Sequence, residues 1–166
     1  VEKYAPLVIS QKSKQFTPYI TVLEKGTRVS FNNQDDITHH IYSAIGKNRF
    51  AFKLQAEQAR EDIVFNSAGV VVMGCNIHDW MSGYLLVVKT PYFAKTDAHG
   101  QASFNSVQQG KYRLVVWHPQ LQTSDNKMSI ERNITASRSY TIDLNSIVDR
   151  PPEQKNEDDF DFLSDY

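Results

Sequence analysis

The residues with the clearest chemical potential lie in one short run, Gly74-Cys-Asn-Ile-His-Asp-Trp-Met81. The run holds a thiol at Cys75, an imidazole at His78 and a thioether at Met81, and Cys75 is the only cysteine of the chain. A pair of imidazoles, His39-His40, stands far upstream. One thiolate, two imidazole nitrogens and a long, weak thioether contact form the donor set of a type 1 copper centre. The run and the upstream pair therefore predict one mononuclear copper site.

The single cysteine also excludes other kinds of site. A disulfide within the chain and a closed zinc site of four cysteines both need more sulfur than the chain has. Cys75 and His78 have the residue types of a nucleophilic pair, but neither a nucleophile elbow nor an oxyanion-forming loop flanks them, so we do not expect an enzyme. The paired acids Asp35-Asp36 are expected to belong to a polar turn without acid–base work.

The residues of the predicted site must be positioned by short expected strands, in which side chains alternate between two faces. Tyr19–Leu23 and Thr27–Phe31 alternate their side chains between two faces. Similar runs, rich in residues that suit a pleated surface, recur at Ile41–Ala44, Glu61–Phe65, Val70–Gly74, Tyr84–Val88, Ala102–Asn105, Tyr112–Trp117, Lys127–Ile130 and Ser139–Leu144. Turn signals separate the runs at intervals of about 8–12 residues, which is typical of an all-β sandwich or barrel. Cys75 then lies at a strand end, with His78 and Met81 on the following loop.

Length and charge limit the partners. A chain of 166 residues, 40% of them hydrophobic, can form one good core or two small ones. Its 18 basic and 19 acidic residues give a net charge of −1, which offers no general attraction to nucleic acid. No apolar run approaches the roughly 20 residues of a membrane-spanning helix. We therefore expect neither a nucleic-acid partner nor a transmembrane segment.

Changes in composition predict three parts. The strand pattern before residue 90 runs into Pro91, and proline is confined to strand edges and bulges, so we expect the copper-binding domain to span residues 1–90. Residues 91–148 have strand and turn patterns of their own but are few for an independent core, so we expect a small β-module packed on the first. Residues 149–166 are acidic, and we expect a disordered tail.

The chain resembles the cupredoxins, the superfamily of plastocyanin and amicyanin. The Cys-x2-His-x2-Met spacing of Cys75, His78 and Met81 is similar to the ligand loop of amicyanin. The match is closer to the bacterial cupredoxin-like proteins labelled methylamine utilization proteins. Four of their patterns are met here, namely an Asp before a His-His-Ile-Tyr-Ser stretch at Asp36 and 39–43, the run at 74–81, Thr-Pro-Tyr-Phe-Ala-x-Thr-Asp at 90–97, and Trp-His-Pro at 117–119.

The resemblance covers roughly residues 7–121 and implies a Greek-key cupredoxin sandwich. It implies as copper ligands His39, Cys75, His78 and Met81. His39 fits better than its neighbour because the family places Ile or Val two positions after the ligand, as at Ile41. Where plastocyanin-like proteins have Asn directly after this ligand, the chain has His40, which leaves open whether His40 bridges the two ligand loops or binds metal. The later module resembles the carboxypeptidase-regulatory and transthyretin-like β-sandwiches.

The function that this resemblance implies is one-electron transfer through a copper ion that cycles between Cu(I) and Cu(II). It implies a periplasmic or secreted bacterial protein and a redox partner protein, such as a c-type cytochrome or an oxidoreductase. The partner is expected to dock where His78 reaches the surface, ringed by Ile77, Trp80 and Met81. Other readings stay open: a copper carrier or sensor with the same ligands, a nonblue copper site with His40 as a ligand, and a structural β-module that binds nothing.

Overall fold

The computed structural model describes residues 7–151, and throughout this range the regular elements are strands. The expected all-β class is therefore confirmed. None of these residues forms a helix that could cross a membrane. Residues 1–6 and 152–166 lie outside the described range, and with them almost all of the expected acidic tail.

The chain folds as two units, and the division falls after Ala102. The described residues of the first unit are 7–102, and those of the second are 103–151. The segment 91–102, which we expected to open the second part, belongs by its contacts to the first unit.

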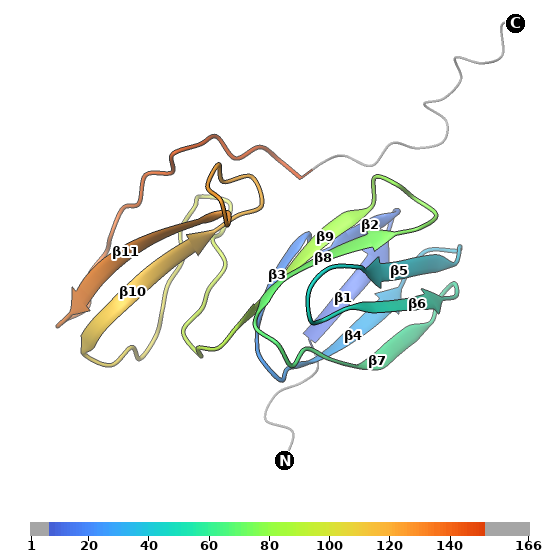
Figure 1. The fold of residues 1–166 in the computed structure, drawn as a ribbon, viewed down its shortest axis with the longest axis horizontal. Coiled ribbons are helices and arrows are strands. Elements are labelled where there is room, and N and C mark those ends of the chain that lie inside the picture. The colour runs from blue at the N-terminus through green and yellow to red at the C-terminus, as the bar shows by residue number, and fades with distance from the viewer. Residues whose placement is uncertain (1–6, 152–166) are drawn as a thin grey trace, which may run out of the picture. The chain divides into compact units, whose positions relative to one another are not determined.

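The first unit contains two sheets (Figure 1). The five-stranded sheet has the order β3 (Ile20–Glu24), β9 (Ser82–Val88), β8 (Gly69–Cys75), β5 (His39–Ser43) and β6 (Phe50–Leu54). The four-stranded sheet has the order β2 (Gln15–Thr17), β1 (Leu7–Lys12), β4 (Arg28–Asn33) and β7 (Ala59–Val64). The chain passes from one sheet to the other at β2–β3, β3–β4, β4–β5, β6–β7 and β7–β8, which is the connectivity of a sandwich.

Most neighbouring strands are antiparallel, but two pairs are parallel. β1 runs parallel to β4, with Leu7 opposite Val29. β3 runs parallel to β9, with Ile20 opposite Tyr84. Parallel pairs need long connections, and the connection from β3 to β9 contains the strands β4 to β8.

Alternation along the strands builds a core between the sheets. Along β5 every second side chain is buried, and along β9 the buried positions are Gly83, Leu85 and Val87. Phe31 of β4 is fully buried, with its ring centroid 5.7 Å from that of Phe50 and 5.3 Å from that of Phe52. The inward side chains of both sheets thus form one hydrophobic cluster, which also contains Cys75 and Met81.

The second unit contains a single hairpin among its described residues. β10 (Gly110–Trp117) pairs with β11 (Lys127–Ile134) in antiparallel register, with Leu114 opposite Ile130. The strands expected over 102–105 and 139–144 are not formed. In this part of the chain Leu121 is the one buried hydrophobic side chain. A two-stranded hairpin buries too little to build a sandwich, so the expected carboxypeptidase-regulatory or transthyretin-like module is not confirmed.

Candidate metal centre

Three side chains with metal-binding atoms meet at one end of the five-stranded sheet. The Cys75 sulfur Sγ lies 3.6 Å from Nδ1 of His39 and 3.7 Å from Nδ1 of His78. The ligand atoms of the three residues all lie within 4.8 Å of one another. The structure thus brings together three of the four residues expected as ligands, in an arrangement that could hold a metal ion.

Strand pairing explains why residues so far apart in sequence meet. β5 and β8 are antiparallel neighbours, with Ile41 opposite Cys75 and Tyr42 opposite Gly74. His39 begins β5 and Cys75 ends β8, so both residues lie at the same end of the pair. His39 and Ile41 are both fully buried, which follows from the two-residue repeat of a strand.

The same alternation separates His40 from the centre. The His40 side chain is half-buried and, as the next residue along β5, points to the other face of the sheet from His39. The cluster accordingly contains His39 and not His40. The bridge between the ligand loops is made by the backbone of His40, because its carbonyl accepts a 3.1 Å hydrogen bond from the N–H of Asn76.

The loop after β8 turns back into the unit. The Met81 N–H donates a 2.9 Å hydrogen bond to the carbonyl of His78, which closes a tight turn between these two expected ligands. The Met81 side chain is 1% exposed and belongs to the same hydrophobic cluster as Cys75. The structure therefore places Met81 inside the unit, and its role as the fourth ligand remains a prediction.

The centre is closed to solvent. Relative exposure is 0% for His39 and 3% for both Cys75 and His78. A substrate could not reach the thiolate without movement of the loop, which disfavours a nucleophilic Cys–His pair.

The expectation that His78 reaches the surface is wrong: the exposed residues of this loop are Asn76, Ile77 and Asp79, and Ile77, at 49%, is the hydrophobic one among them. Trp80 is half-buried, and its ring lies 5.7 Å from the His78 imidazole.

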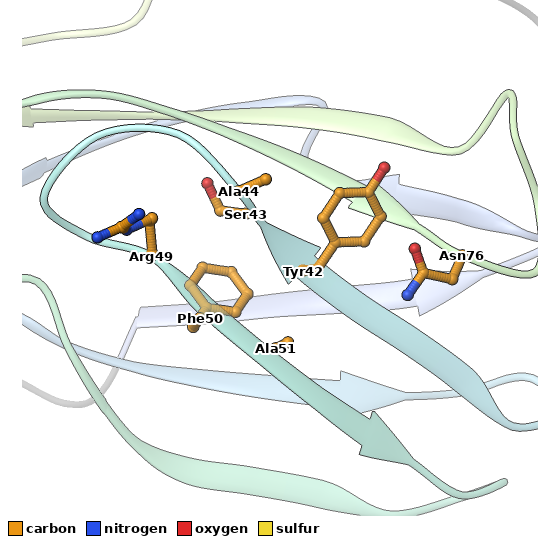
Figure 2. A pocket seen from close by; sticks show the side chains of 7 residues that line it. All are labelled: Tyr42, Ser43, Ala44, Arg49, Phe50, Ala51 and Asn76. Atoms are coloured by element: carbon orange, nitrogen blue, oxygen red, sulfur yellow. The ribbon is translucent and has the colours of Figure 1, made fainter.

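Tyr42 covers the outer side of the strand that carries Cys75. A Cβ added at Gly74 would lie 2.9 Å from the Tyr42 ring, so this ring rests directly on Gly74. Figure 2 shows the hollow beside it, with Tyr42 and Asn76 over β5 and Phe50 and Ala51 on β6. The hollow is lined by Tyr42, Ser43, Ala44, Arg49, Phe50, Ala51 and Asn76. The Tyr42 ring thus covers the outer side of β8 at the residue before Cys75.

Asp35 is the residue of the site that the sequence reasoning missed. Its carboxylate oxygen Oδ2 lies 2.8 Å from Nε2 of His39, the imidazole nitrogen that faces away from Cys75. We expected Asp35 to belong to a polar turn without a functional role, and we matched the aspartate of the family's His-His-Ile-Tyr-Ser pattern to Asp36. The only signal in the sequence is an acid four positions before the ligand histidine, and Asp36 stands one position closer to it.

Electrostatics favours the ionised thiolate. Burial raises the pKa of Cys75, but hydrogen bonds from His39, from the backbone at Ile77 and His40 and from His78 outweigh burial and lower the pKa to about 6. Burial lowers the pKa of His39, yet its hydrogen bonds to Cys75 and Asp35 leave this pKa above its ordinary value. The metal-free centre therefore already holds sulfur in the form that binds metal.

We expect Cys75 to ionise in the folded, metal-free protein with a midpoint near pH 6, against about 8.5 for an ordinary thiol. The ultraviolet absorbance of the thiolate measures this midpoint, with Cys75→Ser as the blank. Because protons compete with metal for the sulfur only below that pKa, copper affinity should fall as the pH drops through 6 and respond little to this group above it. A midpoint at or above the ordinary value would contradict the geometry described here.

The donor set fits copper. A thiolate and two imidazole nitrogens in one plane, with a weak fourth contact, are preferred by copper in electron-transfer sites. A thiolate, two imidazoles and no clustered carboxylate disfavour magnesium and calcium, which prefer oxygen.

Comparison with known proteins gives matches to parts of the chain. A family described as Polysaccharide lyase family 4, domain II matches residues 76–143, which is less than half of the chain. No curated protein matches the sequence. A copper-containing nitrite reductase from Thermus scotoductus SA-01 is 24% identical with a TM-score of 0.49, over 52% of this chain and 23% of the reductase. A reduced amicyanin variant is 20% identical with a TM-score of 0.46, over 52% of this chain and 87% of amicyanin.

Proposed function

We propose that the first unit is a cupredoxin in which His39, Cys75 and His78 would hold one copper ion, with Met81 as the fourth ligand, and that it transfers single electrons. The observation that carries this proposal is the convergence of one buried sulfur and two imidazole Nδ1 atoms within 4.8 Å of one another. When bound, copper supplies a one-electron couple between Cu(I) and Cu(II). The thiolate and the two imidazoles would hold it, and the chain determines their geometry.

The chain holds its donors in place before metal arrives. Backbone pairing of β5 with β8 sets His39 against Cys75, and the hydrogen bond from Asn76 to His40 ties the second loop to β5. The turn between Met81 and His78 fixes the remaining imidazole. A preorganised donor set changes little between the two oxidation states, which lowers the barrier to electron transfer.

The test is to load the metal-free protein with Cu(II) and to record its visible absorption and electron paramagnetic resonance spectra. The proposal expects an intense thiolate-to-copper charge-transfer band, a reversible reduction potential and fast electron self-exchange. A colourless complex would favour a nonblue site or a copper carrier, and absence of binding would leave only a structural β-module.

The burial of the donors argues for moving electrons rather than copper. A carrier or sensor must release its metal, and release from a centre whose donors are at most 3% exposed requires the loop to open. A nonblue site that uses His40 would require this side chain to cross to the other face of the sheet. We therefore place electron transfer first among these functions and assign no catalytic step to the centre. A periplasmic or secreted location and a redox partner protein belong to the same proposal.

Electrons are proposed to enter and leave through Ile77 and Trp80. Ile77 is exposed beside His78, and the Trp80 ring contacts the His78 imidazole, so these apolar side chains connect the surface with a buried donor. Replacement of Ile77 by glutamate should slow electron self-exchange by about tenfold or more, because two copies would bring like charges together at the point of contact. Nuclear magnetic resonance line broadening in mixtures of the reduced and oxidised protein measures this rate.

Ile45 offers a matched control for that variant. It is also an exposed isoleucine, at 73%, and it lies beyond the end of β5 opposite to His39. Ile45→Glu introduces the same charge and should leave self-exchange nearly unchanged, while both variants keep the copper spectrum of the parent. If both variants slow self-exchange equally, electrons do not enter and leave through Ile77 and Trp80.

A further inference from the structure

Asp35 makes the shortest polar contact of the His39 imidazole. Oδ2 of Asp35 lies 2.8 Å from Nε2 of His39, and the side chains are 12% and 0% exposed. The two residues are four positions apart, across the loop that enters β5. Their contact lies on the side of the imidazole away from the Cys75 sulfur, which faces Nδ1.

The same carboxylate receives two backbone donors from another part of the chain. The Ser13 N–H donates to Oδ1 at 2.6 Å, and the Lys14 N–H donates to Oδ2 at 3.0 Å. Both residues have positive φ, 54° and 57°, so the turn between β1 and β2 is coiled in the left-handed region with both N–H groups directed at Asp35. An ionised carboxylate only accepts hydrogen bonds, so the proton in the third contact belongs to Nε2 of His39.

Asp35 is itself held in place by the fully buried Asn33. The Asp35 N–H donates to Oδ1 of Asn33 at 3.0 Å. The Asn33 amide donates in turn to three backbone carbonyls, at 2.7 Å to Ile37, 3.1 Å to Leu54 and 3.0 Å to Gln55. The loop between β4 and β5 is therefore tied on several sides, and the position of the carboxylate is determined by the fold.

We propose that Asp35 is a positioning residue: it keeps a proton on Nε2 of His39, which leaves Nδ1 as the atom that binds the metal, and it links the centre to the β1–β2 turn. This inference rests on the proposed copper site. Carboxylates that accept the free N–H of a ligand histidine fix its ring and tautomer, and their loss typically lowers metal affinity about 10–100-fold. Because Ser13 and Lys14 hold the same carboxylate, the turn between β1 and β2, which lies outside both ligand loops, also takes part in setting the geometry of the metal site.

The test compares Asp35→Ala with Asp36→Asn. Asp36 is the adjacent acid and the structure gives it no bond to His39, so both variants remove one negative charge from the same loop. In the metal-free protein, proton–nitrogen correlation spectra should show a proton on Nε2 of His39 in the parent and in Asp36→Asn, and only a partly protonated Nε2 in Asp35→Ala. In competition with a Cu(I) chelator, Asp35→Ala should lose about 10–100-fold in affinity and Asp36→Asn less than about twofold.

A more conservative variant keeps the test valid if Asp35→Ala does not fold. Asp35→Asn keeps one oxygen that can accept from His39 but turns an amide against the N–H groups of Ser13 and Lys14, so we expect a smaller loss in the same direction. An inserted glycine between Ser13 and Lys14 tests the turn, with an inserted glycine after Gly46 as control. Loops tolerate such insertions at little entropic cost, and only the first should weaken copper binding.

The outcomes separate this inference from the proposed function. If Asp35→Ala keeps the Nε2–H form and the affinity of Asp36→Asn, the positioning role is wrong even though the protein binds copper. If the glycine after Ser13 has no effect while Asp35→Ala does, the link to the turn is wrong. If the parent protein takes up no copper, the proposed function fails, and the tautomer spectra still decide whether Asp35 fixes His39.

Discussion

Replacement of Cys75 by serine is expected to abolish the intense visible absorption of the copper-loaded protein. The band requires a thiolate bound to the metal, and a serine hydroxyl neither ionises under these conditions nor offers a sulfur orbital. Because Cys75 is the only cysteine of the chain, no other thiol can take its place. Copper affinity should fall by more than the roughly 10–100-fold that is typical for loss of an outer hydrogen-bond partner, since a direct ligand is removed.

A second variant distinguishes the role of the Cys75 sulfur, which would give the absorption band, from that of the Met81 sulfur, which would influence the reduction potential. Met81→Leu removes the thioether and retains an apolar side chain of similar size at a position that is 1% exposed. We expect this variant to keep the charge-transfer band and to shift the reduction potential, because a weak thioether contact would tune the couple. Persistence of the band in Cys75→Ser would disprove the type 1 assignment. An unshifted potential in Met81→Leu would remove Met81 from the ligand set.

Replacement of Phe31 by alanine is expected to give the largest loss of stability. The Phe31 ring is fully buried between the two sheets and contacts the rings of Phe50 and Phe52. Removal of a buried phenylalanine typically costs about 3–5 kcal/mol, as lost transfer energy and as a cavity that neighbours fill only in part. Since domains of this kind are stable by about 5–15 kcal/mol, the loss is a large share of the whole.

Urea unfolding of the metal-free protein measures this difference. Phe93→Ala serves as the control, because Phe93 belongs to the same unit by contacts, lies outside its strands and is 37% exposed. We expect the control to change the free energy of unfolding by less than about 1 kcal/mol. Similar losses for both variants would mean that the ring cluster around Phe31 is not the centre of the core.

The features that the sequence predicted well are those set by local patterns. Alternation over 19–23 and 27–31 predicted two strands, and the structure has β3 and β4 there, each shifted by one or two residues. The convergence of His39 with Cys75 and His78 followed from donor chemistry and from a family resemblance, and strand pairing realises it. A period of two along β5 also explains why His39 enters the centre and His40 does not.

The features that it missed depend on contacts between distant segments. Asp35 acquires its role from a turn 21 and 22 residues earlier, and no local pattern distinguishes it from Asp36. The burial of His78 depends on how the loop folds back after β8, which the apolar run did not specify. Strands expected over 102–105 and 139–144 had suitable residues but no partner, and strand propensity is expressed only in a paired sheet.

The parallel pairing of β3 with β9 has a consequence for the order in which the protein can acquire its metal. All four proposed ligands lie in the stretch of chain between these two strands, so their pairing closes a long loop around the whole donor set. Contacts of such long sequence separation form slowly, because the entropy of closure is lost before the contacts are gained. We therefore expect copper capture to follow folding: during refolding with copper present, the charge-transfer band should grow no faster than the sheet itself, at a rate independent of copper concentration.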